Sequence, residues 1–436
     1  MKHLVWFRVD LRIEDHPALD AARRAGGEVI ALYAVTPTTW KYHEMAECKI
    51  DFIQRNLRCL ASRLQSLGID LHCVEMDSYD NTPPQFIEFC KHNQISHVYF
   101  NQQYEIDERR RDEAVTQHCQ AAGIEVQTFQ EQVFIQPGMV LSAVNLPLQK
   151  FTPFKRRWIA FADQLGFDKP QCPVSLNLPE QEQAQLWPAG EAEAWRRLQH
   201  FLTEHAAEYD EWRDFPARSG TSTLSPYLAL GVISIRQVLY ALHAAAGTTS
   251  FGELIQSKGY GTWLNELIWR EFYKHILLLF PKVACGQTLQ ARFKVWPWRQ
   301  DEAQFKLWCE GKTGYPLIDA AMRQLNQTGW MHNRLRMNVA VFLAKFLKID
   351  WRWGESYFSR HLIDGDLSAN NGGWQWCAGT GTDAMPYFRM FNPTLQAQKF
   401  DPEGTFIRQY CPELRHLDNK NIHLPQPHAL EKYHAS

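Results

Sequence analysis

The first 130 residues alternate short apolar runs with longer segments of helical periodicity. The short runs are rich in β-branched and aromatic residues, as in strands buried on both faces of a parallel sheet, and they span residues 3–9, 29–35, 70–75, 97–101 and 125–129. Between the second and third runs, apolar side chains recur every three or four residues from Ile50 to Leu67, and Gly68 stands where a helix usually ends. This alternation predicts a doubly wound α/β domain over residues 1–130.

A nicotinamide-dependent dehydrogenase would begin with the same alternation. In such an enzyme the first strand leads into a G-x-G-x-x-G turn, whose glycines let the backbone approach a pyrophosphate. Here the first strand leads into Arg8-Val9-Asp10-Leu11-Arg12, which contains no glycine. The sequence therefore argues against a nicotinamide dehydrogenase.

The pattern changes after residue 130. Prolines interrupt helical periodicity between residues 131 and 199, which predicts an interdomain linker wrapped over the surface; they are Pro137, Pro147, Pro153, Pro170, Pro173, Pro179 and Pro188. Helical patterns dominate from residue 200 to residue 436, with long ones over 263–280 and 315–347, the latter interrupted near Gly329. We therefore expect an α/β domain (1–130), a linker (131–199) and an all-helical domain (200–436).

Composition narrows the class of protein without naming a function. Hydrophobic residues make up 45% of the 436, enough for a large core, and the formal net charge of −2 leaves room for a local basic patch that binds nucleic acid. The 10 cysteines show no C-x-x-C spacing, so we expect reduced thiols and no metal site. Because no apolar run approaches the ~18 residues of a membrane span, we expect a soluble protein of the cytosol.

The segment RSGTSTLSPYLALG, residues 218–231, carries a candidate phosphate site. Ser225 suits the N-cap of a helix whose first residue is Pro226, and the hydroxyls of Thr221–Thr223 come just before it. Gly220 permits close approach of a ligand to this loop. A helix N-terminus with such a loop can bind phosphate, although an ordinary capped helix has the same pattern.

Three further segments place polar side chains among aromatic ones. Within 263–273, helical spacing puts one set on a single face: Trp263, Glu266, Trp269, Arg270 and Tyr273. Within 332–337, another set falls in about one turn: His332, Asn333, Arg336 and Met337. Asp364 and Asp366 precede the stretch NNGGWQW at 370–376, whose glycines and indoles indicate either a tight core corner or a wall against which a flat aromatic molecule lies.

Taken together, these segments resemble the photolyase/cryptochrome family, and most closely its microbial class I cyclobutane pyrimidine dimer photolyases. The resemblance runs from HLVWFRVDLRIEDHPAL near the start of the chain to PYFRMFNPTLQAQKFDPEGTFIRQY near its end. Its most specific signatures are WLNELIWREFY, EGKTGYPLIDAAMRQL, GWMHNRLRM and DGDLSANNGGWQW. It implies a lyase of light-driven DNA repair. Fully reduced anionic FAD, held in a folded U shape in the helical domain, gives an electron to a flipped-out dimer, which splits into two pyrimidines and returns the electron.

The resemblance also implies which residues hold FAD. They are Tyr209, Thr221, Ser222, Thr223, Leu224, Ser225, Trp263, Arg270, Arg336, Asp364, Gly365, Asp366 and Asn370. Arg336 would pair with Asp364, and Asn370 would lie beside the flavin N5. A neutral amide at that place accommodates an anionic flavin without adding a second negative charge, which favours repair chemistry.

For catalysis the resemblance implies Glu266, Asn333, Asn370, Trp269, Trp376 and Met337. Trp269 and Trp376 would hold the flipped dimer by stacking, worth ~1–3 kcal/mol per base, and a damaged base is the least costly to flip. Glu266 and Asn333 would bind the edges of the dimer. The related (6-4) photolyases carry a histidine pair near position 333, so Asn333 favours the cyclobutane lesion.

An electron chain and a DNA surface complete the implied site. Electrons would pass along Trp374, Trp351 and Trp298, the last of these toward solvent. The expected DNA contacts are Glu266, Trp269, Arg270, Tyr273, Lys274, Asn333, Arg334, Arg389 and Lys399. DNA that contains cyclobutane pyrimidine dimers is the expected partner, with no obligate protein partner and a monomeric state.

A second, light-harvesting chromophore is usual in this family, and its site would include His43, Asp107 and Glu108. A folate, 5,10-methenyltetrahydrofolate, is the first choice, with a flavin, a deazaflavin or no antenna as alternatives. Two departures leave the choice open, because Asp107 replaces an asparagine and Cys285 stands where a lysine is expected. The rival function is a blue-light-sensing cryptochrome without repair, from which we expect a long signalling tail that this sequence does not carry.

Overall fold

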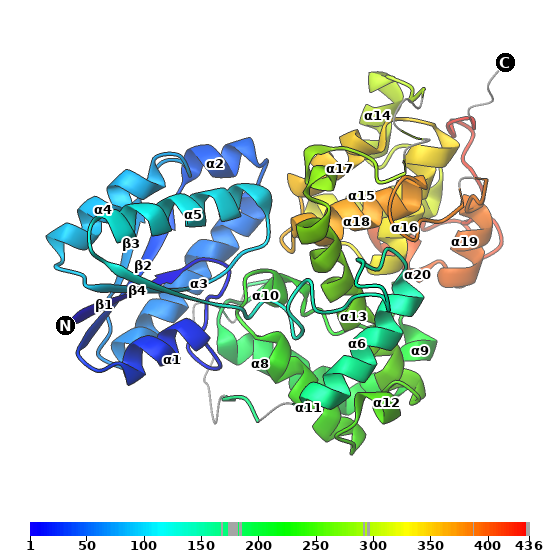
Figure 1. Ribbon diagram of the computed structural model, residues 1–436. Coiled ribbons are helices and arrows are strands. Elements are labelled where there is room, and N and C mark those ends of the chain that lie inside the picture. Colours follow the sequence, from blue (N-terminus) through cyan, green and yellow to red (C-terminus); the bar gives the residue numbers. More distant parts are fainter. Residues whose placement is uncertain are drawn as a thin grey trace.

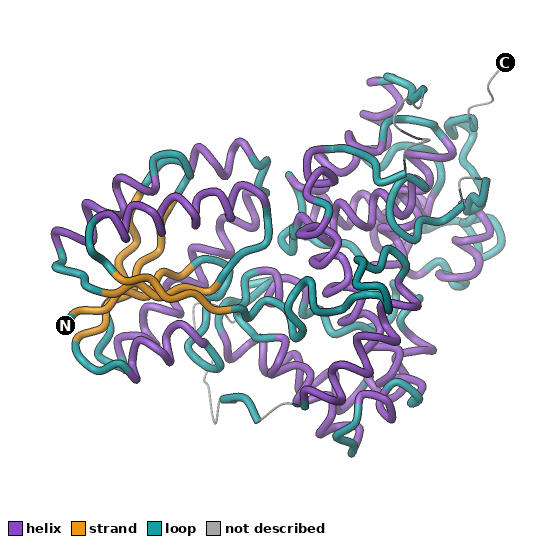
Figure 2. The backbone as a smooth tube through the Cα atoms, in the orientation of Figure 1, coloured by secondary structure: helices purple, strands orange, loops and turns teal. Residues whose placement is uncertain are grey.

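The computed structural model describes residues 1–166, 169–172, 182, 185–290, 293, 297–386 and 388–432. An α/β body and a larger helical body lie side by side, and a long segment joins them (Figure 1). In the backbone trace all strands gather in the first body, while helices and loops make up the second (Figure 2). The fold class expected from the sequence is therefore confirmed.

The sheet is parallel, with the strand order β3-β2-β1-β4-β5. Its strands are β1 (Lys2–Phe7), β2 (Glu28–Val35), β3 (Leu71–Glu75), β4 (His97–Asn101) and β5 (Glu125–Phe129). These bounds lie within two residues of the apolar runs in the sequence. The chain builds β2 and β3 on one side of β1 and β4 and β5 on the other, so the crevice at the carboxyl ends of β1 and β4 is the expected ligand site.

Helices cover both faces of this sheet (Figure 1). On one face lie α1 (Pro17–Arg24) and α3 (Glu47–Gln65); on the other lie α4 (Thr82–His92) and α5 (Ile106–Ala121), while α2 (Pro37–Tyr42) follows the end of β2. Side chains of β1 alternate between the two faces, because Val5 packs in the α1/α3 cluster and Leu4 in the α4/α5 cluster. The α1/α3 cluster continues without a break into the helical body, which fixes the two bodies against each other.

The helical body is built around the 22-residue helix α13 (Lys258–Leu279). Its other helices are α6 (Phe151–Leu165), α8 (Glu191–Glu204), α9 (Tyr209–Trp212), α10 (Ser225–Ala229), α11 (Ile235–Ala246), α12 (Phe251–Leu254), α14 (Glu302–Cys309), α15 (Pro316–Thr328), α16 (Asn333–Val341), α17 (Trp351–Ser359), α18 (Leu367–Ala378), α19 (Pro393–Phe400) and α20 (Thr405–Tyr410). Short 3₁₀ helices are η1 (Ala206–Glu208), η2 (Pro281–Cys285) and η5 (Pro412–Leu414), and the π-helical segment η4 (Phe342–Phe346) directly follows α16. Gly329, in the left-handed conformation at φ 68°, ends α15 and so separates it from α16.

The linker expected over 131–199 is not a surface connector throughout. Helix α6 occupies its middle, because Pro153 falls in the first helical turn, where a missing backbone N–H does no harm. This helix packs into the helical body, and the buried Trp158 donates from Nε1 to Glu271 Oε2 on α13 at 2.5 Å. The helical body therefore begins with α6, and α8 begins nine residues before the expected boundary at 200. Of the prolines behind that expectation, Pro173 and Pro179 lie outside the described residues.

Arg12 locks the connection between the two bodies. Its side chain is fully buried, and Nη2 meets Glu131 Oε2 at 2.6 Å while Nη1 donates to the carbonyl of Gly231 at 3.0 Å. The backbones approach so closely here that a Cβ on Gly231 would lie 2.2 Å from the carbonyl oxygen of Val9. The two bodies are therefore held in a fixed relation, and the cavity that lies between them is part of the fold.

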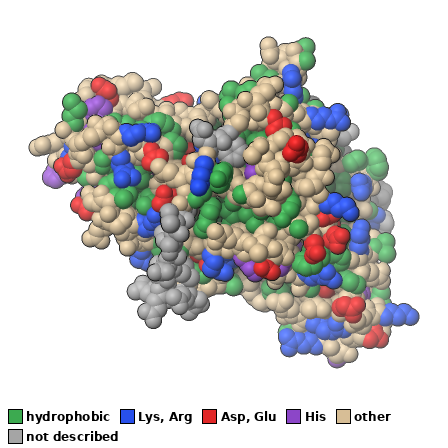
Figure 3. All heavy atoms as spheres, turned by 90° about the horizontal axis from the view of Figure 1, so that it is seen from below, with side chains coloured by type: hydrophobic (Ala, Val, Ile, Leu, Met, Phe, Trp, Pro, Cys, Tyr) green, Lys and Arg blue, Asp and Glu red, His purple; other side chains and the backbone are tan. Residues whose placement is uncertain are grey.

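Three further features bear on the class of protein. In the described part of the chain, no helix has both the length and the apolar character needed to cross a bilayer. On the face seen from below, basic and acidic side chains are interspersed, and hydrophobic side chains gather near the middle (Figure 3). No group of three or more His, Cys, Asp or Glu side chains is arranged to hold a metal ion within the described ranges.

Candidate functional site

Two cavities meet at the segment that precedes α18. The central cavity, of about 500 Å³, lies inside the helical body between the 221–225 loop, α13, α16 and α18. The interdomain cavity, of about 780 Å³, lies between the carboxyl end of the sheet and the helical body. The two share part of their walls, and the shared residues are Leu228, Ala229, Arg270, Asp366 and Asn370.

The 221–225 loop forms one polar wall of the central cavity, and all five of its residues line it. Thr223 adopts a left-handed conformation at φ 50°, which is rare for a β-branched residue. Ser225 is not the N-cap that the sequence predicts, because it is the first helical residue of α10 and its Oγ accepts from Trp330 Nε1 at 3.2 Å. Since α10 has only five residues, a phosphate here would rely on the loop's own hydroxyls and backbone N–H groups.

Helix α13 forms the opposite wall and presents the aromatic and polar face that its spacing predicts. The residues of this face that line the central cavity are Trp263, Glu266, Trp269, Arg270 and Tyr273. Glu266 Oε1 pairs with Arg213 Nη1 at 2.8 Å, with 28% of the Glu266 side chain and 21% of the Arg213 side chain exposed. Arg270, the cation that sequence spacing would pair with Glu266, instead donates to the carbonyl of Gln132 at 2.7 Å.

The mouth of the central cavity is lined by aromatic and amide side chains. The Trp269 indole stacks on Phe151, with centroids 3.7 Å apart and planes inclined by 7°. Trp376, Asn333 and Met337 also line the cavity, and Asn333 is exposed. The stacking holds Trp269 in one orientation, so that it offers a fixed plane to a ligand.

On the inner side of the cavity, Arg336 and Asp364 form the ion pair that the resemblance implies. Arg336 Nη2 lies 2.7 Å from Asp364 Oδ2, and Arg336 Nε donates to the carbonyl of Met331 at 2.8 Å. The second oxygen, Asp364 Oδ1, is buried without a hydrogen-bond partner among the described residues. A buried acceptor left in this way fits a donor group on a bound molecule.

Asp366 caps α18 and faces both cavities. Its Oδ1 accepts from the backbone N–H of Ala369 at 3.0 Å, and its Oδ2 pairs with Lys274 Nζ at 2.8 Å. Burial would raise the pKa of Asp366, but Lys274 and Arg270 outweigh it and hold that pKa well below its usual range. The carboxylate is therefore charged at neutral pH.

Two residues lie elsewhere than the sequence analysis predicts. Lys274, expected on the DNA surface, has a side chain only 3% exposed and lines the interdomain cavity, because it follows Arg270 by one helical turn on the face of α13 that meets the α/β body. Gly365, expected at the flavin, lines the interdomain cavity and not the central one. Its carbonyl accepts from Lys49 Nζ of α3 at 2.6 Å, which draws it toward the α/β body.

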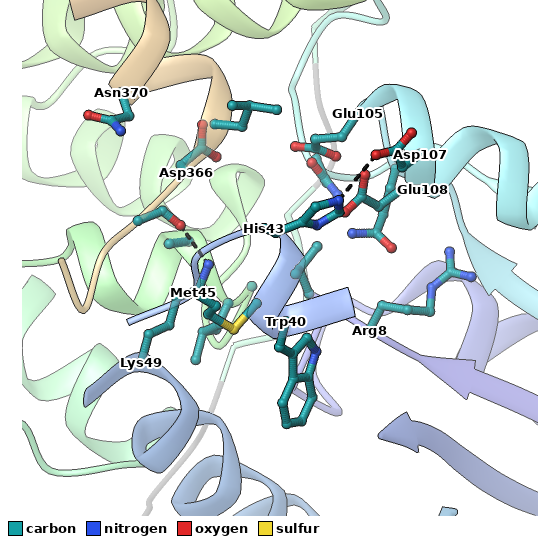
Figure 4. Close-up of a pocket in the computed structure, with 18 of the residues that line it drawn as sticks. Arg8, Trp40, His43, Met45, Lys49, Glu105, Asp107, Glu108, Asp366 and Asn370 are labelled. Carbon is teal, nitrogen blue, oxygen red and sulfur yellow. Dashed lines mark hydrogen bonds and ion pairs between the residues drawn. The ribbon is translucent and has the colours of Figure 1, made fainter. Parts of the chain in front are cut away.

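Asn370 lines both cavities, and Figure 4 shows it at the interdomain cavity, on the same side as Asp366. Its Nδ2 donates to the carbonyl of Glu355 at 3.0 Å and to Ser359 Oγ at 3.1 Å, so both amide hydrogens are used by the protein. The amide oxygen remains as the polar atom for a ligand. Nearby, burial raises the pKa of Glu355 to about 7, against the hydrogen bond from Asn371 that lowers it.

The stretch NNGGWQW is part of the continuous helix α18, so the tight core corner considered from the sequence is wrong. Its glycines serve two different purposes. A Cβ on Gly372 would lie 2.2 Å from the Tyr273 ring, so this glycine lets α18 pack against α13. A Cβ on Gly373 would meet nothing within 4 Å and would project into the central cavity, which Gly373 lines.

The tryptophans of the expected electron chain lie in one apolar cluster. Trp374 lines the central cavity and is 2% exposed, and α17 approaches it so closely that a Cβ on Gly354 would lie 2.1 Å from its ring. Trp351 is fully buried and Trp298 half-buried. A backbone bridge between Arg299 and Ile349 brings the segment that carries Trp298 beside the start of α17.

The basic residues expected at DNA differ in their surroundings. Arg334 pairs with Asp214 at 2.7 Å and lies over the Phe400 ring, 4.7 Å from its centroid. Lys399 is exposed and lies over the same ring at 5.2 Å. Arg334 lines the central cavity, whereas Arg389 is exposed and lies outside its wall.

The interdomain cavity brings together the residues expected at an antenna (Figure 4). His43 Nε2 lies 3.1 Å from Asp107 Oδ2, and Tyr79 donates to Glu108 Oε1 at 3.1 Å. Burial raises the pKa of Glu108. Cys285 lines the same cavity, which reaches to the carboxyl ends of β1 and β2.

Sequence reasoning missed some residues of these walls. Arg213 and Trp330 line the central cavity, and Lys49 and Glu105 line the interdomain cavity. Arg213 follows Tyr209 by four residues, a spacing that puts both on one helical face and could have indicated it. The others depend on contacts between distant segments, for which the sequence holds no local signal.

Comparison with known proteins agrees with this architecture. A family model described as "DNA photolyase" matches residues 3–174, and "FAD binding domain of DNA photolyase" matches residues 263–435. Over an alignment of 439 residues, the chain is 44% identical to the deoxyribodipyrimidine photo-lyase of Vibrio cholerae. The alignment covers 97% of this chain and 92% of that protein.

Solved structures are similar over the same length. A photolyase from Sulfolobus tokodaii with two FAD molecules is 30% identical, with a TM-score of 0.81 over 97% of this chain and 93% of that one. A cryptochrome from Synechocystis is 29% identical, with a TM-score of 0.83 over 97% and 91%. The fold and its central cavity thus define a two-domain light-dependent flavoprotein, and the chain belongs to the DNA photolyase family.

The central cavity fits FAD in its chemistry. It offers the unpartnered Asp364 Oδ1, the amide oxygen of Asn370, the polar 221–225 loop and the open space beside Gly373. These features lie around one cavity and would face a flat ligand from several sides. The match to an FAD binding domain supports FAD as a cofactor of this chain, and the chemistry of the central cavity fits it.

The two adjacent glycines of α18 give a matched test of this fit. Gly373→Leu should fold normally, since glycine disfavours helix by roughly 1 kcal/mol, but should lower the flavin bound per protein at least tenfold by filling its space. Gly372→Ala should lower the melting temperature instead, because its methyl group would clash with Tyr273. Flavin absorbance and thermal unfolding measured on both variants check this. Full flavin content in Gly373→Leu would contradict the assignment of the cavity.

Proposed function

We propose that this protein splits cyclobutane pyrimidine dimers in DNA under light, with FAD held in the central cavity. The observation that carries the proposal is that one cavity of about 500 Å³ is lined both by the polar 221–225 loop and by Trp269, Trp376, Glu266 and Asn333. When bound there in its fully reduced anionic form, FAD supplies a light-driven electron to the dimer. The protein's own residues hold, orient and shield the two reactants.

We assign the FAD-binding residues of the resemblance to this cavity, apart from Gly365. The polar 221–225 loop would take the pyrophosphate, with Tyr209 and Trp263 beside it. Asp364, steadied by Arg336, would accept a hydrogen bond from the flavin through its free Oδ1. Asn370 would present its amide oxygen to the flavin edge, and a neutral amide leaves the anionic flavin without a repelling neighbour.

The mouth of the cavity would hold the flipped dimer. Trp269 and Trp376 would stack on its bases, at about 1–3 kcal/mol per base. Trp269 supports this role through its own stacking on Phe151, which fixes the plane it offers. Asn333 and Glu266 would bind the polar edges of the dimer, and Met337 would pack against it.

DNA around the lesion would meet a smaller basic set than the sequence suggests. Arg334 and Lys399 share contact with Phe400 and would take backbone phosphates, together with the exposed Arg389. Arg270 and Tyr273 belong to the cavity wall, where they would support the flavin and the lesion. Lys274 has no part in DNA contact.

The fold alone does not separate repair from light sensing, since the Synechocystis cryptochrome is as similar in structure as the photolyase. The test is to purify the protein with bound flavin, reduce it chemically, and illuminate it with an oligonucleotide that contains one thymine dimer. Dimers should disappear in the light and persist in the dark. A bound flavin without any light-dependent loss of dimers would favour the cryptochrome alternative.

Glu266 offers a sharper test, because its ion pair with Arg213 is partly exposed and contributes less than about 1 kcal/mol to stability. A hydrogen bond from the dimer to a carboxylate is worth roughly 1.5–3 kcal/mol. Glu266→Ala should therefore bind flavin normally, bind dimer-containing DNA about tenfold more weakly and repair fewer dimers per absorbed photon. Glu266→Gln keeps a hydrogen-bond acceptor, so its dimer affinity and repair yield should fall between those of the original protein and of Glu266→Ala. A Glu266→Ala protein that melts early yet repairs normally per bound lesion would refute the role.

We further propose that Trp374, Trp351 and Trp298 carry electrons from the surface to an oxidised flavin. Their shared apolar cluster and the half-buried position of Trp298 support this order. Trp298→Phe should abolish photoreduction of the oxidised flavin and leave repair by chemically reduced protein nearly intact. Trp195→Phe, which packs against the α1/α3 cluster, is the matched control and should change neither photoreduction nor repair. Equal loss of both activities in Trp298→Phe would overturn the assignment.

We propose that the interdomain cavity holds the antenna, and that a folate is its first candidate. His43, Asp107 and Glu108 support this, while Asp107 and Cys285 depart from the expected amide and lysine. The cavity also reaches the sheet's carboxyl end, where a flavin or deazaflavin would lie. The wavelength dependence of repair decides among these chromophores, because an antenna adds its own absorption band to that of the flavin.

The monomeric state and the cytosolic location stay predictions.

A further inference from the structure

A third cavity, which we call the basic cavity, borders the 221–223 loop. It has a volume of about 420 Å³ and shares Trp330 and the three loop residues with the central cavity. The rest of its wall comes from α8, the turn at 215–219 and His332. The role assigned to the 221–225 loop at the FAD pyrophosphate accounts for this shared wall, but no role assigned to the flavin, the lesion or the antenna accounts for the rest.

The walls of the basic cavity carry positive charge without a matching acid. Arg196, Arg197 and Arg218 line it, and no aspartate or glutamate is among its lining residues. Beneath the surface, the buried Glu193 pairs with Arg196 at 2.7 Å and with Arg197 at 2.6 Å, so one carboxylate is shared by two guanidinium groups. The cavity therefore keeps an excess of positive charge that attracts anions.

Arg218 is the cation best placed to bind a ligand. It is exposed, and its guanidinium lies over aromatic rings, 5.3 Å from the Phe215 centroid and 6.0 Å from that of Trp212. Within the described residues it has no carboxylate partner. A guanidinium supported on rings in this way keeps its N–H fork available for a phosphate.

His332 adds a directed donor. Its side chain is 2% exposed, and Nδ1 accepts from the backbone N–H of Arg334 at 3.2 Å, which caps α16. Because burial lowers the pKa of His332 to about 4, the ring is neutral and the proton sits on Nε2. This Nε2–H is buried and has no acceptor among the described residues. His332 therefore brings an unsatisfied buried donor to the wall of the basic cavity, where a small rotation of the ring would let it reach a ligand.

The size of the cavity narrows the ligand class. At about 420 Å³ it falls within the roughly 300–1,000 Å³ of small-molecule sites and exceeds what a lone phosphate would fill. The hydroxyl of Ser219 adds a donor, and the Trp330 indole adds a flat wall. Phosphate with an attached sugar or base matches this combination of cations, neutral donors and an aromatic surface.

We propose that the basic cavity binds the phosphate of a nucleotide unit, at a site separate from FAD. Arg218 would pair with the phosphate, and His332 Nε2–H would donate to it or to its ester oxygen. The same phosphate ester could belong to a free mononucleotide or to the backbone of bound DNA, and the experiment below distinguishes these two sources. This inference does not depend on dimer splitting and would hold for a repair enzyme or a light sensor.

The test uses the flavin-loaded protein, titrated calorimetrically with AMP and, separately, with a short undamaged single-stranded oligonucleotide. Arg218→Ala should weaken binding of at least one of the two about tenfold without changing flavin content. The matched control is Arg24→Ala, an exposed arginine on α1 of the other body, which should change neither affinity. If Arg218→Ala loses affinity for AMP, a free nucleotide is the source of the phosphate. If it loses affinity for the oligonucleotide alone, and by the same factor when the oligonucleotide contains a dimer, the source is the DNA backbone.

Two results would overturn the inference. One is an Arg218→Ala protein that binds AMP and both oligonucleotides as tightly as the original. The other is AMP binding seen only in flavin-free protein, since that ligand would then occupy the flavin site. A nitrogen-15 resonance of His332 Nε2 that shifts on ligand addition would support direct contact, and an unmoved resonance alongside unchanged affinities would exclude it.

Discussion

The buried ion pair between Lys274 and Asp366 stands at the point where both bodies and both large cavities meet. Lys274 is 3% exposed, and its buried charge is balanced by the Asp366 carboxylate at 2.8 Å and, less closely, by the Glu105 carboxylate at 3.8 Å. The two residues that precede Asp366 contact two further helices. The Gly365 carbonyl accepts a hydrogen bond from Lys49 of α3, and Asp364 pairs with Arg336 of α16. Three consecutive residues thereby hold together α3, α13 and α16, and they set the position at which α18 begins.

This arrangement explains how one helix can serve two cavities. Asp366 caps α18, so the ion pair also fixes where the turns of that helix fall. Asn370 comes one turn later on the wall between the cavities, and Gly373 and Trp374 face the central cavity. The light-driven electron transfer that we propose needs the flavin edge, the lesion pocket and the tryptophans in fixed relation, and a single helix supplies that relation.

Much of this could be predicted from the sequence because the signals are local. The strands of the sheet follow from short apolar runs, and the cavity face of α13 follows from three- and four-residue spacing. What could not be predicted depends on contacts between distant segments. The partner of Glu266 is Arg213, 53 residues away, and the burial of Lys274 depends on the approach of the α/β body. Similarly, the sequence marks Pro153 as a helix breaker, whereas its place in the first turn of α6 makes it harmless.

The most direct test of this account is a double-mutant cycle on Lys274 and Asp366. For each variant, chemical denaturation gives the unfolding free energy, and absorbance gives the flavin content. Removing one member of a buried pair costs about 3–5 kcal/mol because the other charge stays buried. Lys274→Met and Asp366→Asn should each lower the unfolding free energy by about 3 kcal/mol and release flavin. The double variant should lose at least about 2 kcal/mol less than the sum of the two. Additive losses, or single variants that keep their flavin, would contradict the claim that this ion pair organises the site.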